Sequence, residues 1–438
     1  MSRKRREQRA TGAWYDLTPA QKSLWLQEQA APPRTSYHAL VVMRCSPRVD
    51  RARLEKATKA LIAQNQSLWL EWSPEGLQRQ ASTPNTCFDR ITTTSVTPRA
   101  QLDEIRQWHA SRSATYGAGI AVIHCPDSIR IASFSHHLAN DGWTTVRCCE
   151  RIAKNYALLE KDPDYVFAMD NFFLETLKES NAYLKSAGHA RDAMFWRNEC
   201  ARMDGAPMIS QLADRAQQTE DPYVVQSLYR TCLPDLHEAL VKVSASLSLS
   251  LAECVTALTA IYLAQYSAEP CLTLGVVFHN RTWHTLRVSG LFAEVFPMTV
   301  PGTAAKQPIH QAVRAITNAF RRTLEHGRYP IVEMLSRHGL DPRHTEVSIN
   351  TLFLKRSILL EGEPTHLQWL TGPESGLSFF FTQFGRDAPL DIALWFNRAR
   401  FETATIDGHA DRLLSFLETA CSDLVGAPRQ RQTGTRID

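Results

Sequence analysis

The stretch SFSHHLANDGWTTV (Ser133–Val146) contains two adjacent histidines and, four residues after the second, an Asp-Gly pair. The run that leads into it, Ile129–Phe134, is apolar and β-branched, which is typical of a buried strand. The Asp-Gly pair is a turn signal, and apolar residues recur at helical spacing after Gly142. We therefore predict a strand ending at His136 and His137, a turn, and a helix that begins just beyond it.

This arrangement suits acid–base chemistry at His137. A histidine whose pKa lies near neutrality can accept a proton from an amine or hydroxyl that attacks a carbonyl group. Its other ring nitrogen must then be held by a carbonyl or carboxylate, and N–H groups near Gly142 could face a developing oxyanion. Asp141 either points inward, as the base or as the group that orients the ring, or points away and forms a structural ion pair. The residues alone leave open a simpler interpretation, in which His137 is a packed or surface histidine beside an ordinary turn.

Composition limits the class of protein. At 438 residues the chain exceeds the size at which a single core usually stops growing, so we expect two lobes. The net charge of +4 arises largely from the opening MSRKRREQR, so the body is close to neutral and we expect no nucleic-acid partner. We find no secretory signal and no membrane span, and we expect a cytoplasmic protein with ten reduced cysteines.

The sequence lacks the common cofactor motifs. It contains no HExxH, P-loop, dinucleotide fingerprint or GxSxG elbow, and its cysteine spacings match no metal pattern. We therefore expect no bound metal and no bound cofactor.

Helical and strand patterns alternate in both halves of the chain, which predicts an α/β protein. We expect a disordered basic tail over residues 1–13, a first lobe over 14–175, a second lobe over 176–425 and a flexible tail over 426–438. The segments that we predict as helices are Leu17–Gln29, Asp50–Gln66, the segment after Gly142, Ala190–Met203, two helices within Pro234–Ser267, Ile309–His326 and a closing helix that ends near Leu424. The predicted strands are Tyr37–Cys45, SLWLEWS (Ser67–Ser73), the hairpin that ends at His137, the two that end near Arg281 and Pro297, and those near EVSINTLFL, SGLSFFFTQF and LDIALWFN.

HHLANDGW resembles the HHxxxDG signature of the condensation domains of nonribosomal peptide synthetases, a family within a wider group of acyltransferases. Flanking segments resemble further family motifs in the family's order, from about Leu17 to about Leu424. These segments are LTPAQKSLWLQEQ, FWRNECARMDGAP, LGVVFHNRT with Gly275 and Arg281, SGLFAEVFPMTV, and HGRYPIVEML with His326, Pro330 and Glu333.

The resemblance implies two chloramphenicol acetyltransferase-like lobes, each with a mixed sheet flanked by helices, in a V-shaped pseudo-dimer with an active-site tunnel between them. It implies that His137 is the catalytic residue, as a general base or as a group that orients the nucleophile. Asp141 would be structural and pair with Arg281, so that losing one partner costs ~3–5 kcal/mol. The supporting residues would be His136, Gly142 and Trp143.

We also predict that Asn280, Glu294 and Ser348 line the tunnel. Glu294 departs from the family's usual asparagine, and it either faces a charged group of the acceptor or is a solvated rim residue. The acyl donor would be a thioester on the phosphopantetheine arm of a carrier protein. We expect a free-standing, monomeric enzyme that meets its carrier proteins in trans.

The predicted reaction is acyl transfer to an amine or hydroxyl acceptor in nonribosomal peptide or hybrid polyketide biosynthesis. The products of such pathways would be secondary metabolites such as antibiotics. Two alternatives remain from the sequence. One is an O-acyltransferase of the wax-ester or mycobacterial-ester type, which uses acyl-CoA or a carrier and shares HHxxxDG. The other is a degenerate carrier-binding scaffold without catalysis.

Overall fold

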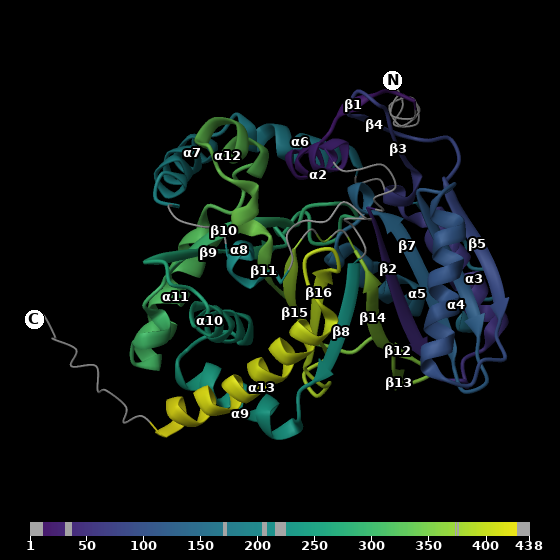
Figure 1. Ribbon diagram of the computed structural model, residues 1–438. Coiled ribbons are helices and arrows are strands. Elements are labelled where there is room, and N and C mark those ends of the chain that lie inside the picture. Colours follow the sequence, from purple (N-terminus) through teal and green to yellow (C-terminus); the bar gives the residue numbers. More distant parts are fainter. Residues whose placement is uncertain are drawn as a thin grey trace, which may run out of the picture.

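The computed structural model describes residues 12–30, 37–169, 173–203, 208–214, 225–372, 374 and 376–426. Within them two mixed sheets carry the fold, one built mainly from each half of the chain (Figure 1). The predicted α/β class is confirmed.

The first sheet has the strand order β14-β2-β7-β6-β5. Its strands are β2 (His38–Cys45), β5 (Thr86–Thr92), β6 (Ala118–His124), β7 (Ile129–His136) and β14 (His366–Thr371). Only the β5–β6 pair is parallel.

Alternation along β2 assigns the two faces of this sheet. Val41 and Met43 pack with α3 (Arg51–Gln64) and α5 (Gly142–Lys161), whereas Leu40 and Val42 share a second cluster with α4 (Pro98–Ser113). Each face is therefore covered by helix, and the end of β7 is fixed between two packed layers.

The second sheet has the order β10-β9-β11-β15-β16-β8. Its strands are β8 (Val225–Thr231), β9 (Cys271–Phe278), β10 (Glu294–Pro301), β11 (Val347–Leu354), β15 (Leu377–Phe384) and β16 (Asp391–Asn397). β15 is buried at every position, as expected of a central strand covered on both faces.

The remaining helices surround the second sheet or bridge the two halves (Figure 1). They are α2 (Pro19–Ala30), α6 (Phe173–Leu184), α7 (Ala187–Cys200), α8 (Ile209–Leu212), α9 (Pro234–Ser246), α10 (Leu251–Ala264), α11 (Ile309–Glu325), α12 (Ile331–His338) and α13 (Thr403–Gly426). Short 3₁₀ turns are η1 (Gln66–Trp69), η2 (His137–Ala139), η3 (Ala304–Lys306) and η4 (Pro342–Thr345). No single helix of the described chain is long and apolar enough to cross a membrane; α9 and α10 pass such a test only as a pair bent by 104°.

A strand from the second half completes the first sheet. β14 pairs antiparallel with β2, from His366 opposite Arg44 to Thr371 opposite Leu40. The Tyr229 hydroxyl on β8 donates to the Trp369 carbonyl on β14, which links the two sheets. Small sheets formed by β1 (Tyr15–Asp16), β4 (Leu77–Gln80) and β3 (Leu70–Trp72), and by β12 (Leu359–Leu360) and β13 (Glu363–Pro364), lie outside these two.

One predicted strand is partly wrong. SLWLEWS begins within the 3₁₀ turn η1, and only Leu70–Trp72 forms a strand. The Asn65 side chain accepts from the Ser67 N–H and caps this turn, a local signal that outweighs strand propensity. Most of the predicted tails, residues 1–11 and 427–438, lie outside the described residues.

Candidate active site

His137 lies where β7 ends, as the first residue of η2. Its backbone N–H donates to the Tyr37 carbonyl (2.8 Å), and its ring Nδ1 lies 2.5 Å from the Asn140 carbonyl oxygen. A carbonyl oxygen only accepts, so Nδ1 carries the proton and Nε2 keeps its lone pair. Burial lowers the pKa of His137, which favours the neutral ring near neutral pH. The ring is therefore held in the tautomer that a general base requires.

His137 lines a cavity of about 730 Å³ between the two halves of the chain. A volume of this size is typical of a small-molecule site. Its wall combines Gly142 and Trp143 at the start of α5 with strand and loop residues of the second half. The predicted tunnel residues Asn280, Glu294 and Ser348 all line it.

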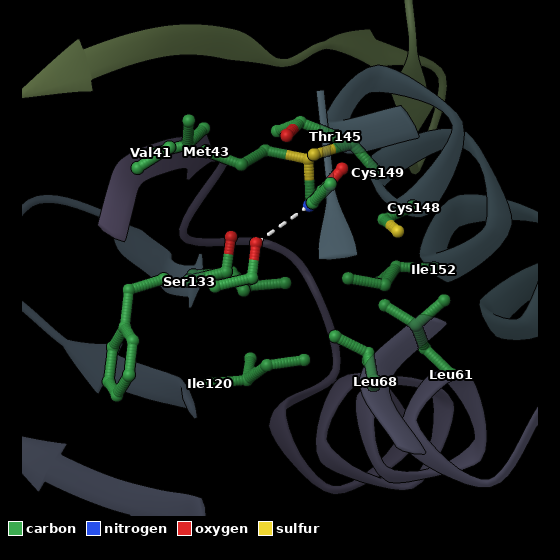
Figure 2. A pocket seen from close by; sticks show the side chains of 15 residues that line it. Val41, Met43, Leu61, Leu68, Ile120, Ser133, Thr145, Cys148, Cys149 and Ile152 are labelled. Carbon is green, nitrogen blue, oxygen red and sulfur yellow. Dashed lines mark hydrogen bonds between the residues drawn. The ribbon is translucent and has the colours of Figure 1, made fainter. Parts of the chain in front are cut away.

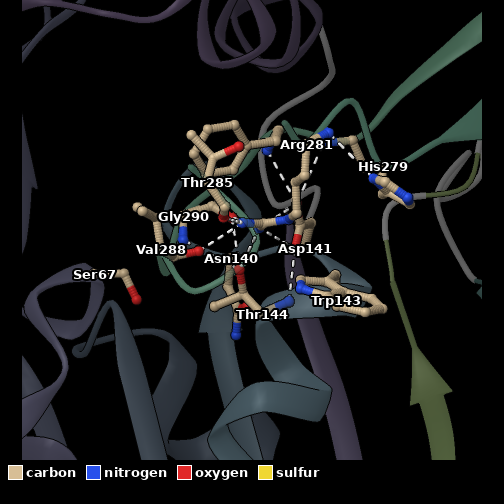
Figure 3. A network of polar contacts seen from close by, with 12 residues as sticks. Ser67, Asn140, Asp141, Trp143, Thr144, His279, Arg281, Thr285, Val288 and Gly290 are labelled. Atoms are coloured by element: carbon tan, nitrogen blue, oxygen red, sulfur yellow. Dashed lines mark hydrogen bonds and ion pairs between the residues drawn. The ribbon is translucent and has the colours of Figure 1, made fainter. Parts of the chain in front are cut away.

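Asp141 and Arg281 form a fully buried ion pair, with Nη2 2.9 Å from both carboxylate oxygens. Figure 3 shows the two side chains meeting between α5 and the loop after β9. The carboxylate also accepts N–H groups from Thr144 (2.7 Å), Phe292 (3.0 Å) and Ala293 (3.2 Å). Burial alone would raise the pKa of Asp141, but Arg281 and these N–H donors lower it below its ordinary value. Because both of its oxygens are engaged in this way, Asp141 is a structural anchor and does not orient the His137 ring.

Arg281 organises the loop that follows β9. Its Nη1 donates to the carbonyls of Thr285 (3.0 Å) and Val288 (2.5 Å), and its Nη2 donates to that of Gly290 (3.0 Å). The guanidinium also lies 4.2 Å from the centre of the Phe292 ring. One side chain therefore fixes this loop of the second half against the start of α5.

His136 points to different partners and does not line the large cavity. Its Nε2 lies 3.0 Å from Glu28 Oε1 on α2, and its Nδ1 accepts the Leu138 N–H (3.3 Å). Its ring also contacts Trp72 and His38. It is a packing and hydrogen-bonding residue that connects the histidine turn to α2.

Sequence reasoning missed Thr144 and His279 as residues of the site. The Thr144 hydroxyl accepts from Arg281 Nη2 (2.7 Å) and donates to the Gly290 carbonyl (2.8 Å), so it bridges the two halves. Trp143 Nε1 donates to the Leu286 carbonyl (3.0 Å), and its ring lies beside His279 (Figure 3). The Thr-Thr after the Asp-Gly pair was visible in the sequence, but its partners lie more than 100 residues away.

A second, smaller cavity lies behind the site in the core of the first half. Figure 2 shows Leu61, Leu68, Ile120 and Ile152 around it. Its volume of about 30 Å³ has room for about two water molecules, so it offers no space to a substrate group. Within the described chain, no group of three or more His, Cys, Asp or Glu side chains is arranged to hold a metal ion.

Solved structures show which class of protein shares this architecture. The first condensation domain of the calcium-dependent antibiotic synthetase, solved with a substrate analogue, matches with a TM-score of 0.80 and 17% identity, covering 94% of this chain and 98% of that one. VibH, an NRPS condensation enzyme, matches with a TM-score of 0.73 and 21% identity, covering 92% and 95%. The starter condensation domain of rhizomide synthetase, solved with C8-CoA and Leu-SNAC, matches with a TM-score of 0.79 and 20% identity, covering 94% and 96%. The fold is therefore that of condensation domains, with two chloramphenicol acetyltransferase-like lobes.

The family model for the condensation domain matches residues 13–432, and the chain belongs to this family of acyltransferases. Among curated relatives, the dimodular nonribosomal peptide synthase of Bacillus subtilis (strain 168) is 23% identical over 421 residues, which is 93% of this chain and 17% of that protein. Surfactin synthase subunit 1 of the same organism is 22% identical over 436 residues, 93% of this chain and 12% of that protein. The chain thus spans less than a fifth of the length of these relatives.

Proposed function

We propose that this chain transfers an acyl group from a carrier-protein phosphopantetheine thioester to an amine or hydroxyl acceptor, in nonribosomal peptide or hybrid polyketide biosynthesis. The observation that carries the proposal is His137, which lines the cavity and has its Nδ1 proton held by the Asn140 carbonyl. Membership of the condensation domain family supports the reaction class.

The proposed chemistry is direct attack on the thioester. The acceptor nitrogen or oxygen bonds to the thioester carbonyl carbon while its proton passes to Nε2 of His137. The C–S bond then breaks, and the departing sulfur takes the proton, which restores the neutral ring. The released carrier bears a free thiol, and the product is an amide or an ester. Atoms and charges balance without a covalent enzyme intermediate.

The start of α5 offers a place for the oxyanion formed in this step. The first N–H groups of a helix have no partner within the helix, and they lie at its positive end. The Thr144 N–H is already bonded to Asp141. We therefore assign the oxyanion to the N–H groups of Gly142 and Trp143, whose residues line the cavity beside His137.

The test is intact-protein mass spectrometry of acyl-loaded carrier proteins, mixed with the enzyme and with candidate amine or alcohol acceptors. We expect loss of the acyl mass from the carrier and formation of the amide or ester. His137→Ala should reduce the rate about 10²–10⁴-fold and leave the fold intact. His284→Ala is the matched control, because His284 is exposed and outside the cavity wall. Near wild-type turnover by His137→Ala would overturn the proposed role.

A further inference from the structure

Two smaller cavities adjoin the active-site cavity in series. A narrow space of about 70 Å³ shares Asn280, Glu294 and Arg328 with the active-site cavity. The same narrow space shares Thr18 and other residues with a groove of about 590 Å³ between α2, α6 and α12. Neighbouring cavities in this series share wall residues, and Glu294 is part of the wall between the narrow space and the active-site cavity.

Glu294 is the first residue of β10, and its carboxyl group lies among α2, α12 and the cavity wall. Oε1 is buried and has no hydrogen-bond partner in the described chain. Burial raises the pKa of Glu294 to about 8, and the Ser23 hydroxyl and Ile331 N–H offset only part of this effect. Of the two interpretations of Glu294, the buried Oε1 favours a residue that faces a charged group of the acceptor over a solvated rim residue.

The other described carboxylates that line the active-site cavity or the narrow space each have a partner. Asp141 is paired with Arg281, and Glu253 with Arg321 (2.6 Å). Glu179 accepts from the Thr282 hydroxyl (2.8 Å) and lies 3.7 Å from Arg328. Glu374 accepts the Gly376 N–H (2.9 Å). Glu294 differs from these carboxylates, because its buried Oε1 has no hydrogen-bond donor in the described chain.

Arg328 lines both cavities beside Glu294 and is a candidate partner, but it is engaged elsewhere. Its guanidinium lies 4.5 Å from the centre of the Tyr183 ring and within ion-pair distance of Glu179. No ion pair joins it to Glu294 among the described contacts. A buried carboxyl without a cation is costly in its charged form, so a cation that enters from the cavity would gain a strong partner.

We propose that Glu294 binds a cationic group of the acceptor, so that the preferred acceptor carries an ammonium or similar cation besides the group that attacks the thioester. This inference rests on the proposed acyl transfer, since it assigns a substrate class to the same cavity. The uncharged nucleophile is then next to His137, while the second, positively charged end of the molecule is held at Glu294.

The test is calorimetric titration of the full chain with 1,6-diaminohexane and with its uncharged isostere, 1,6-hexanediol. The wild-type protein should bind the diamine about tenfold or more tightly than the diol, because hydrogen bonds to a charged group are the stronger ones. Glu294→Gln keeps the size of the side chain but prevents it from ionising when a cation binds. It should therefore weaken diamine binding to the level of the diol and leave diol binding unchanged.

Glu253→Gln is the matched control, because Glu253 lines the same cavity but is paired with Arg321. It should leave diamine affinity unchanged. Equal binding of diamine and diol by the wild type, or equal diamine binding by the wild type and Glu294→Gln, would overturn the inference. No acyl donor is present in these titrations, so a failure of acyl transfer in the mass-spectrometric assay is a separate result.

Discussion

The buried pair of Asp141 and Arg281 gives the sharpest prediction of stability. Asp141→Asn keeps the size of the side chain but leaves the Arg281 guanidinium without a counter-charge where both side chains are wholly buried. The new NH₂ group also faces donors, because the Thr144 N–H lies against one carboxylate oxygen and the Phe292 N–H against the other. Removing one member of such a pair costs about 3–5 kcal/mol in the free energy of unfolding.

Urea unfolding followed by tryptophan fluorescence measures this cost. The midpoint of Asp141→Asn should fall by on the order of 1 M urea. Arg281→Met should cost a similar amount, and the double variant should be more stable than the sum of the two single losses implies, by about 2 kcal/mol. The exposed pair of Arg44 and Asp127, 55% and 47% exposed, is the control, and Arg44→Met should cost less than about 1 kcal/mol.

The effect also has a defined dependence on pH. The pKa of Asp141 is lowered in the folded chain, so its contribution is present above its ordinary pKa and is lost as pH falls through the lowered value. The gap between the wild type and Asp141→Asn should therefore be full at pH 7 and should narrow in strong acid. An unchanged midpoint at pH 7, or additive losses in the double variant, would refute the reasoning.

Two further predictions concern the same site. Because burial lowers the pKa of His137, the base form prevails near neutral pH. In a pH–rate profile of kcat/KM, the apparent pKa of the acid limb should therefore lie below the ordinary histidine value of 6.5. An apparent pKa above 6.5 would contradict this. Thr144→Val removes the hydroxyl that bridges Arg281 and Gly290 and should cost about 1–3 kcal/mol in urea unfolding. Thr144→Ser keeps that hydroxyl and should cost clearly less, whereas equal losses would assign the effect to packing.

Local patterns predicted the part of the site that is local in sequence. β7, the turn and α5 follow from hydrophobic periodicity and from the Asp-Gly signal, and the Asp141 side chain caps α5 at the Thr144 N–H. The partner of Asp141 did not follow from any spacing, because Arg281 is 140 residues away. Only the resemblance to a known family supplied it.

Features made by packing between distant segments were beyond the reach of sequence patterns. Whether Glu294 is enclosed or solvated depends on where α2 and α12 come to lie, and a lone glutamate in a motif gives no sign of it. The short β14 was missed for a similar reason. Its partner strand lies in the other half of the chain, and six residues carry little periodicity.

The position of β14 has a consequence for the order in which the protein can be completed during synthesis. β2 leaves the ribosome early, but the strand that covers its open edge follows roughly 300 residues later. At 5–20 residues per second, that edge stays unpaired for on the order of tens of seconds. An open strand edge is a site of mispairing between chains, so a fragment that ends before His366 should aggregate, and supplying His366–Thr371 as a separate peptide should lessen it.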